Sequence, residues 1–582
     1  MIKNKLKFLV GGEAGDGVFA VGDMIALSYC RAGLEVATTQ EYSSRIRGGH
    51  INCSVRAEEK PLFNHGDDLD LVIALDLDSV QKHFMRIRKG GILLYDNSGP
   101  KFSAAEFAKR PDLKIFPLPA KNLAKDRLGM PVMKNVIMVG AAAGLTDFDP
   151  DFAVLRTILE GMFLRKGIQV VNKNIEAAEI GRDQVKNLGI ETGYKLEPIE
   201  RSDPKMLIDG NDAFSFGALV AGCRFVASYP ITPASDVMEY MVRKFPKYNG
   251  VMVQAEDELA ALNMTIGAAF AGARAMTSSS GPGISLMMEA LGLASMTETS
   301  LVIADIQRCG PSTGMPTKTE QGDLSMLIYG SHGETPRIVL APSDTEECFW
   351  FAIRAFNLAE KYQCPVIFAS DQYLGQSKRT IPRFDLGKVE IDRGLLLSEE
   401  ELKDVEKYFR YAYTETGVSP RVIPSTRKGI FKTSGAEHDD WGNATENPEI
   451  RVKMMDKIFR KLDFARAEML PPHILGNRKS DVTLIGWGST KGIILEAMEM
   501  LKEEDGIDLK LMHITDVWPF PDEFVSNVMG ASKKNIVIEN NFTGQMASLI
   551  RSKTGYDSIK ILKYDGRPFA PRELYHRVKD VL

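Results

Sequence analysis

Short apolar runs that alternate with helical stretches are the feature of this sequence that most restricts its fold. In the first such unit, the apolar run Lys5–Val10 ends at two glycines and is followed by Val18, Val21 and Ile25 at helical spacing. The same alternation returns in the middle of the chain and near its C-terminal end. Strands that alternate with helices form mostly parallel sheets with helices on their faces. The sequence therefore predicts an α/β protein of several doubly wound domains.

The length of 582 residues suits three or four domains of roughly 100–200 residues each. We expect a first α/β domain over 1–190, a polar linker over 191–205 and a second α/β domain over 206–371. A charged, loop-rich connecting region over 372–480 follows, with little regular structure, and a smaller α/β domain over 481–582 completes the chain.

The composition argues against two classes of binding partner. A net charge of -5 gives no sign of a surface for nucleic acid. No stretch approaches the roughly 18 consecutive apolar residues of a membrane span. The N-terminal apolar run is also too short for a secretory signal, and it leads straight into a glycine turn. We therefore expect a cytoplasmic protein that binds neither nucleic acid nor membrane.

Six cysteines are scattered along the chain, and no two of them form a Cys-x-x-Cys pair. A disulfide framework is not expected in a cytosolic protein of this size. An iron–sulfur cluster needs four converging thiolates, of which several are usually close in sequence. We therefore expect any cluster that the chemistry requires to be carried by a partner protein.

Two glycine turns in the first domain are candidate phosphate sites. The run Gly12–Gly17 follows a strand and opens a helix, whose N-terminal N–H groups favour anions. A tight strand-to-helix turn explains it equally well, and its spacing is not that of a dinucleotide fingerprint. Further along, Arg45 and Arg47 stand beside Gly48 and Gly49, a combination that suits a diphosphate because guanidinium groups bind oxyanions in pairs of hydrogen bonds. A solvated surface turn is the alternative.

Polar side chains follow three strands of the second domain. The string Tyr229–Pro233 ends the first strand, and its two prolines hold Thr232 in a rigid segment. Glu256 ends the next strand, and a loop rich in Gly and Pro runs from Arg308 to Lys318 after a third. Plainer explanations are a turn, a helix-capping acid and a mobile loop. Because parallel strands end at one edge, we expect Thr232, Glu256 and Arg308 to converge there.

Several strings together resemble the α subunit of the 2-oxoacid:ferredoxin oxidoreductases, with the family's γ domain fused ahead of it and its transketolase-C-terminal-like domain behind. Residues 434–455 resemble the 2-oxoglutarate branch, also called 2-oxoglutarate synthase, more than the pyruvate branch. The strings that carry the resemblance are Gly11–Gly17, Arg47–Gly49, Tyr229–Pro233, Gln254–Glu256, Gln307–Gln321, Glu539–Gln545 and Lys563–Phe569.

The resemblance implies a thiamine-diphosphate site whose pyrimidine side lies in the second domain. Glu256 is then expected to hydrogen-bond the aminopyrimidine ring and so promote removal of the thiazolium C2 proton. Thr232 is expected to bind the carboxylate or carbonyl of the 2-oxoacid, opposite the positive charge of Arg308 or Lys318. Lys318 stands where relatives have arginine, so it lacks the two-pronged guanidinium. The expected contacts of the cofactor are Pro230, Ile231 and Glu256.

The resemblance also implies an obligate β subunit, in an α2β2 heterotetramer, that holds the diphosphate with Mg²⁺ and carries a 4Fe–4S cluster. The chain itself has neither close cysteines nor a complete Gly-Asp-Gly…Asn magnesium motif of thiamine enzymes. Coenzyme A is the implied acyl acceptor, covered by the γ-like domain, with Arg45, Arg47, Gly48 and Gly49 as contacts. Ferredoxin is the implied electron acceptor.

The implied reaction is the oxidative decarboxylation of 2-oxoglutarate to succinyl-CoA and CO₂, which in reverse would fix carbon in a reductive TCA cycle. Pyruvate or another 2-oxoacid is the alternative substrate, and a non-catalytic scaffold subunit is the alternative from another class. A 2-oxoglutarate pocket also needs a second cation for the distal carboxylate, for which Arg421 and His438 are candidates.

Overall fold

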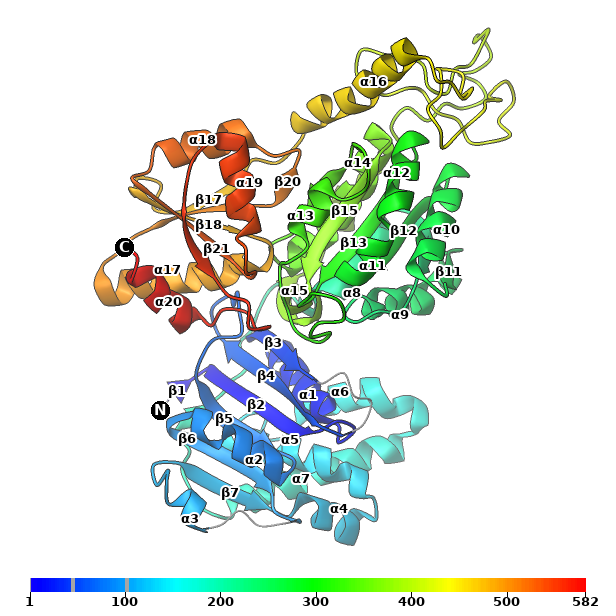
Figure 1. The fold of residues 1–582 in the computed structure, drawn as a ribbon. Helices are drawn as coiled ribbons and strands as arrows, with labels where there is room; N and C mark the ends of the chain where they lie inside the picture. Colours follow the sequence, from blue (N-terminus) through cyan, green and yellow to red (C-terminus); the bar gives the residue numbers. More distant parts are fainter. Residues whose placement is uncertain (1, 43–47, 100–103) are drawn as a thin grey trace. The chain divides into compact units, whose positions relative to one another are not determined.

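The computed structural model describes residues 2–42, 48–99 and 104–582 (Figure 1). It divides the chain into two compact units. The first unit comprises Met1–Ile208 and Ser377–Phe384, and the second comprises Asp209–Gln376 and Asp385–Leu582. Each unit is built from sheets and helices, which confirms the α/β class. No helix in the described ranges has the length and apolar character that crossing a membrane would require.

An eight-stranded sheet forms the centre of the first unit. Its first four strands run parallel, as expected, but the remaining neighbours pair antiparallel. The expectation of a mostly parallel sheet is therefore correct for only half of the strands. The described part of the connection from β3 to β4 contains no helix, and a parallel pair requires a crossover of that kind. In sheet order the strands are β7 (Lys114–Leu118), β6 (Ile87–Asp96), β5 (Leu69–Ala74), β2 (Lys5–Glu13), β4 (His50–Glu58), β3 (Glu35–Glu41), β16 (Arg379–Pro382) and β9 (Lys205–Ile208).

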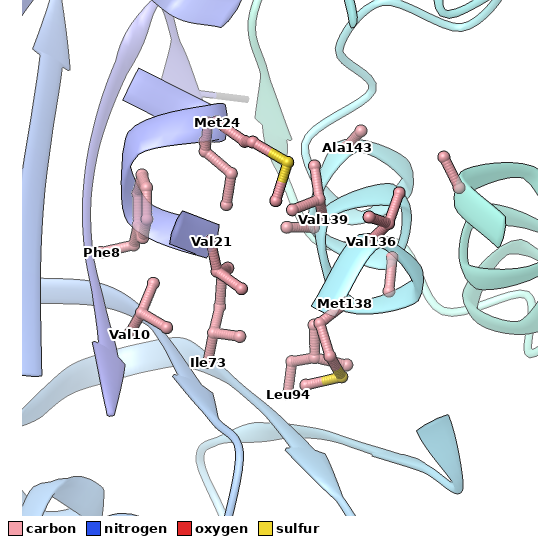
Figure 2. Packing of buried hydrophobic residues seen from close by; sticks show 14 of the residues in the cluster. Phe8, Val10, Val21, Met24, Ile73, Leu94, Val136, Met138, Val139 and Ala143 are labelled. Atoms are coloured by element: carbon pink, nitrogen blue, oxygen red, sulfur yellow. The ribbon is translucent and has the colours of Figure 1, made fainter. Parts of the chain in front are cut away.

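Helices α1 (Val18–Arg31), α5 (Lys134–Leu145) and α7 (Ile168–Lys186) contribute most of the core on one face of this sheet. Figure 2 shows Phe8 and Ile73 of the sheet facing Val21 of α1 and Val139 of α5. The remaining elements of the unit are β1 (Ile2–Lys3), α2 (Leu77–His83), α3 (Ala104–Phe107), α4 (Ala120–Leu128), α6 (Ala153–Phe163) and β8 (Tyr194–Lys195), with short 3-10 turns at Phe84–Arg86, Pro131–Met133 and Leu164–Lys166.

Two glycines allow α5 and α7 to pack closely. A Cβ added to Gly140 would lie 1.9 Å from the carbonyl oxygen of Ala178, and one added to Gly181 would lie 1.9 Å from that of Ile137. Backbone on one helix therefore contacts backbone on the other, and neither site has room for a methyl group.

Replacing Gly140 by Ala is expected to lower the free energy of unfolding by about 1–3 kcal/mol, because the added methyl group forces the two helices apart. Gly161→Ala in α6 is the matched control, since a Cβ there meets no atom within 4 Å. It should be neutral or stabilising by up to about 1 kcal/mol, because alanine favours the helix. Denaturant unfolding of the two variants measures the difference, and equal effects would contradict the close packing.

The expected linker over 191–205 is part of the first unit. Tyr194 and Leu196 are buried, β8 pairs with β1, and the backbone N–H of Glu197 donates to Asn4 Oδ1 at 2.7 Å. The following strand β9 is the sheet edge, so the structural boundary lies after Ile208 rather than at residue 206. The segment lacks periodicity because it packs through isolated side chains rather than along one face.

A seven-stranded sheet forms the centre of the second unit. Six strands are parallel, and β13 and β15 are buried along their full length, as strands covered on both faces should be. The seventh, β20, comes from the C-terminal part of the chain and pairs antiparallel with β14. In sheet order the strands are β11 (Val251–Gln254), β10 (Cys223–Ser228), β12 (Arg274–Ser279), β13 (Leu301–Gln307), β15 (Pro365–Asp371), β14 (Ile338–Leu340) and β20 (Asp516–Trp518).

Helices lie between these strands along the chain, as the alternation predicts. They are α8 (Gly210–Val220), α9 (Ser235–Lys244), α10 (Glu258–Phe270), α11 (Gly281–Leu286), α12 (Met288–Met296), α13 (Leu324–Tyr329), α14 (Thr345–Tyr362) and α15 (Gln372–Gln376), with a 3-10 turn at Phe245–Lys247.

The connecting region has little regular structure over 389–447, as expected, but it then forms the long helix α16 (Pro448–Arg466). The side chain of Asn447 accepts hydrogen bonds from the N–H groups of Glu449 and Ile450, and Pro448 occupies the first turn. An asparagine cap followed by proline is a common start of a helix, so the sequence contained this signal.

A five-stranded sheet forms the C-terminal part of the second unit. Its edge strand β17 begins at His473, ahead of the expected boundary at 481. In sheet order the strands are β17 (His473–Gly476), β19 (Lys510–Ile514), β18 (Val482–Trp487), β21 (Lys534–Glu539) and β22 (Ile559–Leu562). The helices are α17 (Lys491–Asp505), α18 (Asp522–Gly530), α19 (Gln545–Thr554) and α20 (Pro571–Lys579), with 3-10 turns at Gly488–Thr490 and, earlier in the chain, Leu386–Lys388.

Candidate functional site

The carboxyl ends of β11, β10 and β13 lie at one edge of the seven-stranded sheet. The strands β11, β10, β12 and β13 are successive parallel neighbours, and Gln254 pairs with Ser228 at the ends of β11 and β10. Thr232 and Glu256 therefore follow directly beyond paired residues, and Arg308 follows the end of β13. Ligands of parallel sheets bind at this kind of edge.

Arg308 and Thr232 are in direct contact. The Nη1 of Arg308 donates to the carbonyl oxygen of Thr232 at 2.7 Å, and only 8% of the arginine is exposed. Its Nε is buried and has no hydrogen-bond partner in the described part of the chain. Burial lowers the pKa of the Arg308 guanidinium, and nearby Asp323 opposes this effect. The site thus contains a buried cation that has unused hydrogen-bonding capacity.

Glu256 is exposed at the same edge, beyond the edge strand β11. Its neighbour Asp257 caps α10 by accepting a hydrogen bond from the N–H of Ala260 at 2.7 Å. The helix-capping explanation therefore applies to Asp257 and leaves Glu256 unexplained. Among the described residues, the Glu256 carboxylate forms neither a hydrogen bond nor an ion pair.

The loop after Arg308 folds back on itself and brings Lys318 beside the start of the loop. The N–H of Cys309 donates to the carbonyl oxygen of Lys318 at 2.9 Å, and that of Met315 donates to Cys309 at 3.0 Å. Gly566 of the C-terminal part packs against this loop, because a Cβ added there would lie 3.0 Å from the Lys318 Cβ. Lys318 is half-buried and belongs to the same loop as Arg308.

Gln321 fastens this loop to the end of β18 and to the residues after β21. Its side chain donates to the carbonyl oxygen of Trp487 at 3.0 Å and accepts from the N–H of Asn540 at 3.0 Å. Its backbone donates to Asn540 and accepts from the side chain of Asn541. Sequence reasoning did not identify this role, although the polar run Glu539–Asn541 after an apolar strand was an available signal.

Asp305, which is buried, and the partly buried Asp323 are interacting carboxyl groups near this loop. Neither oxygen of Asp305 has a hydrogen-bond partner among the described residues, and the N–H of Asp323 donates to Gln307 Oε1 at 3.0 Å. Burial, and then nearby Asp323, raise the pKa of Asp305. Burial also raises the pKa of Asp323 to about 7, with Glu320 adding to the rise and Arg308 opposing it. Two such groups share a proton more readily than they both ionise.

Asp323→Asn is expected to stabilise the protein, by an amount that grows as the pH rises from about 4 to about 7. The unfolded chain ionises its aspartates near pH 4, whereas folded Asp323 keeps its proton until about pH 7, so folding loses stability across this window. Above it the gain in the variant should reach the order of 4 kcal/mol, because a difference of one pKa unit corresponds to about 1.4 kcal/mol. Thermal unfolding of both proteins near pH 5 and near pH 8 checks this, and a difference that is the same at both pH values would contradict it.

The candidates for a distal-carboxylate cation lie at the opposite edge of the sheet. Arg421 pairs with Glu360 at 2.7 Å, and Arg274, which opens β12, pairs with the same carboxylate. The Nε2 of His438 lies 3.1 Å from the carbonyl oxygen of Met296, ahead of β13. Strands of six residues are roughly 20 Å long, so these side chains do not reach the carboxyl edge. The suggestion that Arg421 or His438 binds substrate beside Thr232 is therefore wrong.

The two glycine turns of the first unit lie side by side. The N–H of Ala14 donates to the carbonyl oxygen of Gly49 at 3.0 Å, and Gly48 and Gly49 have φ angles of 77° and 85°. Gly17 caps α1 with a φ of 82°, which favours glycine. Arg45 and Arg47, the other expected contacts of coenzyme A, lie outside the described residues. Within the described ranges, no three His, Cys, Asp or Glu side chains gather into a metal site.

Three family models match successive parts of the chain. Residues 7–184 match "Pyruvate ferredoxin/flavodoxin oxidoreductase", and residues 216–457 match "Pyruvate flavodoxin/ferredoxin oxidoreductase, thiamine diP-bdg". Residues 474–560 match "Transketolase, C-terminal domain". Thr232, Glu256 and Arg308, which follow the ends of strands, thus belong to a thiamine diphosphate-binding domain.

Similar proteins cover nearly the whole chain. The chain is 35% identical to the α subunit of 2-oxoacid:ferredoxin oxidoreductase 2 of Aeropyrum pernix, over 99% of this chain and 98% of that protein. It is 37% identical to the 2-oxoglutarate synthase subunit KorA of Methanothermobacter thermautotrophicus, over 64% of this chain and 97% of that subunit.

A solved structure has the same fold throughout. The 2-oxoglutarate:ferredoxin oxidoreductase from Magnetococcus marinus, with 2-oxoglutarate, coenzyme A and succinyl-CoA bound, superposes with a TM-score of 0.92 at 35% identity. The match covers 99% of both chains. This chain therefore belongs to the α subunits of the 2-oxoacid:ferredoxin oxidoreductases, oxidoreductases that work together with a β subunit.

Proposed function

We propose that this chain is the catalytic α subunit, with a fused γ-like unit, of a 2-oxoglutarate:ferredoxin oxidoreductase. The complex converts 2-oxoglutarate and coenzyme A into succinyl-CoA and CO₂, and ferredoxin accepts the electrons. The observation that carries the proposal is the contact between Arg308 and Thr232 at the carboxyl edge of the sheet. The choice of 2-oxoglutarate is supported by the names of the relatives from Magnetococcus and Methanothermobacter.

In this proposal Arg308 and Thr232 bind the carboxylate of the 2-oxoacid. The guanidinium is buried and keeps an unpartnered Nε, so a substrate carboxylate there gains a charge-assisted hydrogen bond in a region of low dielectric. The hydroxyl of Thr232 orients the same group, and Lys318 adds a second positive charge from the loop. Gln321 keeps the loop in place by its hydrogen bonds to Trp487 and Asn540.

Glu256 binds the pyrimidine ring of thiamine diphosphate, beside Pro230 and Ile231. An exposed carboxylate without a partner in the described chain fits that role, because a ring brought to this edge can hydrogen-bond it. Bound thiamine diphosphate supplies the carbanion stabilisation that decarboxylation of a 2-oxoacid requires. Glu256 holds the proton shared with the ring. The diphosphate, Mg²⁺ and a 4Fe–4S cluster are assigned to the β subunit of an α2β2 complex.

Coenzyme A is assigned to the γ-like unit. The adjacent turns at Ala14–Gly17 and Gly48–Gly49 allow a backbone to approach phosphate groups closely, and the first of them opens α1. Arg45 and Arg47 follow from the sequence as the phosphate contacts. With a ferredoxin of sufficiently low potential, the same groups serve the reverse reaction, carboxylation of succinyl-CoA.

The proposal is tested by co-expressing the chain with its β subunit and measuring viologen reduction that depends on coenzyme A. The expected result is a kcat/KM for 2-oxoglutarate at least about tenfold above that for pyruvate, because a distal carboxylate adds at least one charged hydrogen bond. Higher activity with pyruvate would keep the mechanism and overturn the substrate. No activity with any 2-oxoacid, from a complex that contains its cluster and thiamine diphosphate, would favour the scaffold function.

A further inference from the structure

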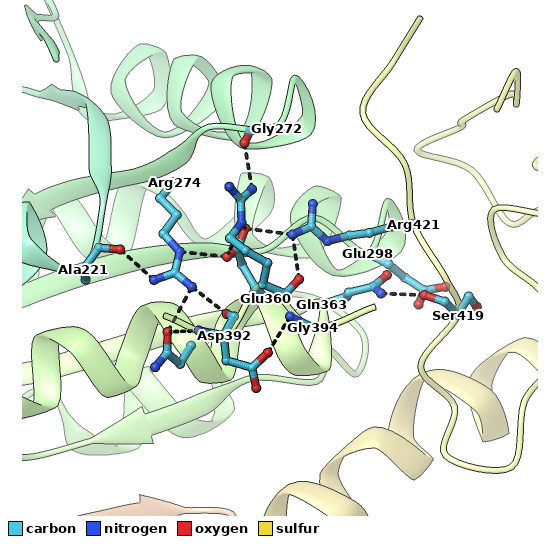
Figure 3. A network of polar contacts seen from close by, with 12 residues as sticks. Ala221, Gly272, Arg274, Glu298, Glu360, Gln363, Asp392, Gly394, Ser419 and Arg421 are labelled. Atoms are coloured by element: carbon cyan, nitrogen blue, oxygen red, sulfur yellow. Dashed lines mark hydrogen bonds and ion pairs between the residues drawn. The ribbon is translucent and has the colours of Figure 1, made fainter. Parts of the chain in front are cut away.

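A cluster of charged side chains is buried at the amino edge of the seven-stranded sheet, where segment 391–466 packs against it (Figure 3). No role in the proposed reaction involves this cluster, since it lies at the far end of the strands from Thr232. Its buried members are the cations Arg274, Arg410, Arg421, Lys457 and Lys461 and the carboxylates Glu298 and Glu360, each at most 6% exposed.

Three arginines form ion pairs with the carboxylate of Glu360. Arg274 and Arg421 each approach one of its oxygens at 2.7 Å, and the more exposed Arg393 approaches at 2.8 Å. Figure 3 shows Arg274 and Arg421 on either side of Glu360. Burial lowers the pKa of both Arg274 and Arg421, although Glu360 opposes the effect. One carboxylate therefore neutralises only part of the charge around it.

Glu298 is likewise shared between two cations. Lys457 Nζ lies 2.5 Å from one oxygen, and Lys461 hydrogen-bonds the other. Within the part of the chain that the structure describes, the hydrogen bonds of Arg410 go to neutral acceptors, namely the side chain of Gln363 at 2.9 Å and the carbonyl oxygen of Glu298 at 2.8 Å. Burial lowers the pKa of Lys457 to about 8, while the surrounding cations hold the pKa of Glu298 well below its usual range.

The cluster therefore has an excess of buried positive charge. Five buried cations face two carboxylates, so three positive charges remain. The C-terminal ends of α12 and α14, near Glu298 and Gln363, each supply about half a negative charge. The more exposed Arg393 and Asp392 add one charge of each sign, so roughly two positive charges are still unbalanced, and leaving such charge buried without a counter-ion is costly.

A cavity that is partly open to solvent lies beside two of these cations, Arg410 and Arg421. Its volume is about 20 Å³, and Arg410, Arg421 and Glu298 are among the residues that line it, with Thr299 and Ser300. The Nε of Arg421 is buried and has no hydrogen-bond partner among the described residues. About 10–15 Å³ of such space holds one water molecule, so the cavity accommodates a single small ion.

We propose that this cavity is a binding site for one small inorganic anion of the size of chloride. The anion accepts a hydrogen bond from Arg421 Nε, balances Arg410 and Arg421, and so holds segment 391–466 against the sheet. The site differs from that of the 2-oxoacid in position and in the size of its ligand. The space of about 20 Å³ favours such an ion over a larger anion such as gluconate.

The direct test is a crystal structure of the wild-type α–β complex grown in sodium bromide, with anomalous data collected at the bromine edge. The expected result is an anomalous peak in the cavity within hydrogen-bonding distance of Arg421 Nε. An ordered water without anomalous signal, or an empty cavity, would overturn the proposal.

A solution test compares thermal unfolding of the complex in sodium chloride and in sodium gluconate at equal ionic strength. At chloride concentrations about ten times the dissociation constant, the unfolding equilibrium constant should fall about tenfold. Arg421→Lys keeps the charge but removes the Nε donor, so it should lose this chloride dependence. Arg393→Lys is the matched control, because Arg393 bonds the same Glu360, and it should keep the dependence. Equal responses of the two variants, or none in the wild type, would contradict the site.

Discussion

Replacing Glu256 by Gln is expected to lower kcat of the assembled α–β enzyme by roughly 100- to 10,000-fold, the usual effect of losing a proton-transfer group. Glutamine has the same shape and can still hydrogen-bond, but it cannot share a proton with the pyrimidine ring. Because Glu256 is exposed and forms no ion pair or hydrogen bond within the described chain, the substitution should leave the fold intact. Steady-state kinetics and a thermal melt on the same preparation separate the two effects.

The matched control for Glu256→Gln is Asp257→Asn, one residue further along. Asp257 caps α10, and asparagine is an equally good capping residue, so both stability and turnover should stay close to those of the wild type. If Glu256→Gln also retained turnover near the wild-type value, the catalytic role of this carboxylate would have to be abandoned.

Replacing Arg308 by Met should lower kcat/KM for the 2-oxoacid by roughly 10- to 150-fold, the range that corresponds to loss of a hydrogen bond to a charged group. Methionine keeps the unbranched apolar part of the side chain while removing the guanidinium charge and the bond to the Thr232 carbonyl oxygen. Most of the loss should be a rise in KM, because the carboxylate is bound both before and during the reaction.

Arg243→Met is the control for the charge change, since Arg243 lies on α9 with more than half of its side chain exposed. It should leave KM unchanged. An Arg308→Met enzyme whose KM for the 2-oxoacid equals that of the wild type, with only its melting temperature changed, would show that Arg308 is structural.

The site could be predicted from the sequence as far as local rules apply. A proline turn, an acidic helix start and a loop rich in Gly and Pro located the ends of β10, β11 and β13, and parallel strands necessarily end at one edge. That argument brought Thr232 and Arg308 together, and the structure confirms their contact. The roles of Glu256 and Lys318 stay predictions, because they depend on a cofactor and a substrate.

Pairings between distant segments could not be predicted. The strand β16 inserts between β3 and β9, and its Thr380 hydrogen-bonds Glu35 of β3, more than three hundred residues away in sequence. The sequence pattern of a four-residue strand contains no information about a partner so distant in the chain. The hydrogen bonds of Gln321 to the C-terminal part escaped prediction for the same reason.

Buried acids were also missed, for a different reason. Asp305 lies within the apolar run of β13. A single polar residue in such a run does not change the prediction of a buried strand, so it gives no sign of a functional or titratable group. Only the structure shows that its oxygens have no partner among the described residues and that Asp323 lies nearby. The charge cluster at the amino edge has the same origin, since Arg274, Glu360 and Lys457 belong to three separate segments.

A cryo-EM map of the α–β complex with thiamine diphosphate and 2-oxoglutarate, frozen before turnover, tests the central claim most directly. We expect the 2-oxoacid carboxylate within hydrogen-bonding distance of Arg308 and the Thr232 hydroxyl, and the pyrimidine ring beside Glu256. Density for the 2-oxoacid at any other surface of the complex, with the carboxyl edge of the seven-stranded sheet empty, would contradict the account.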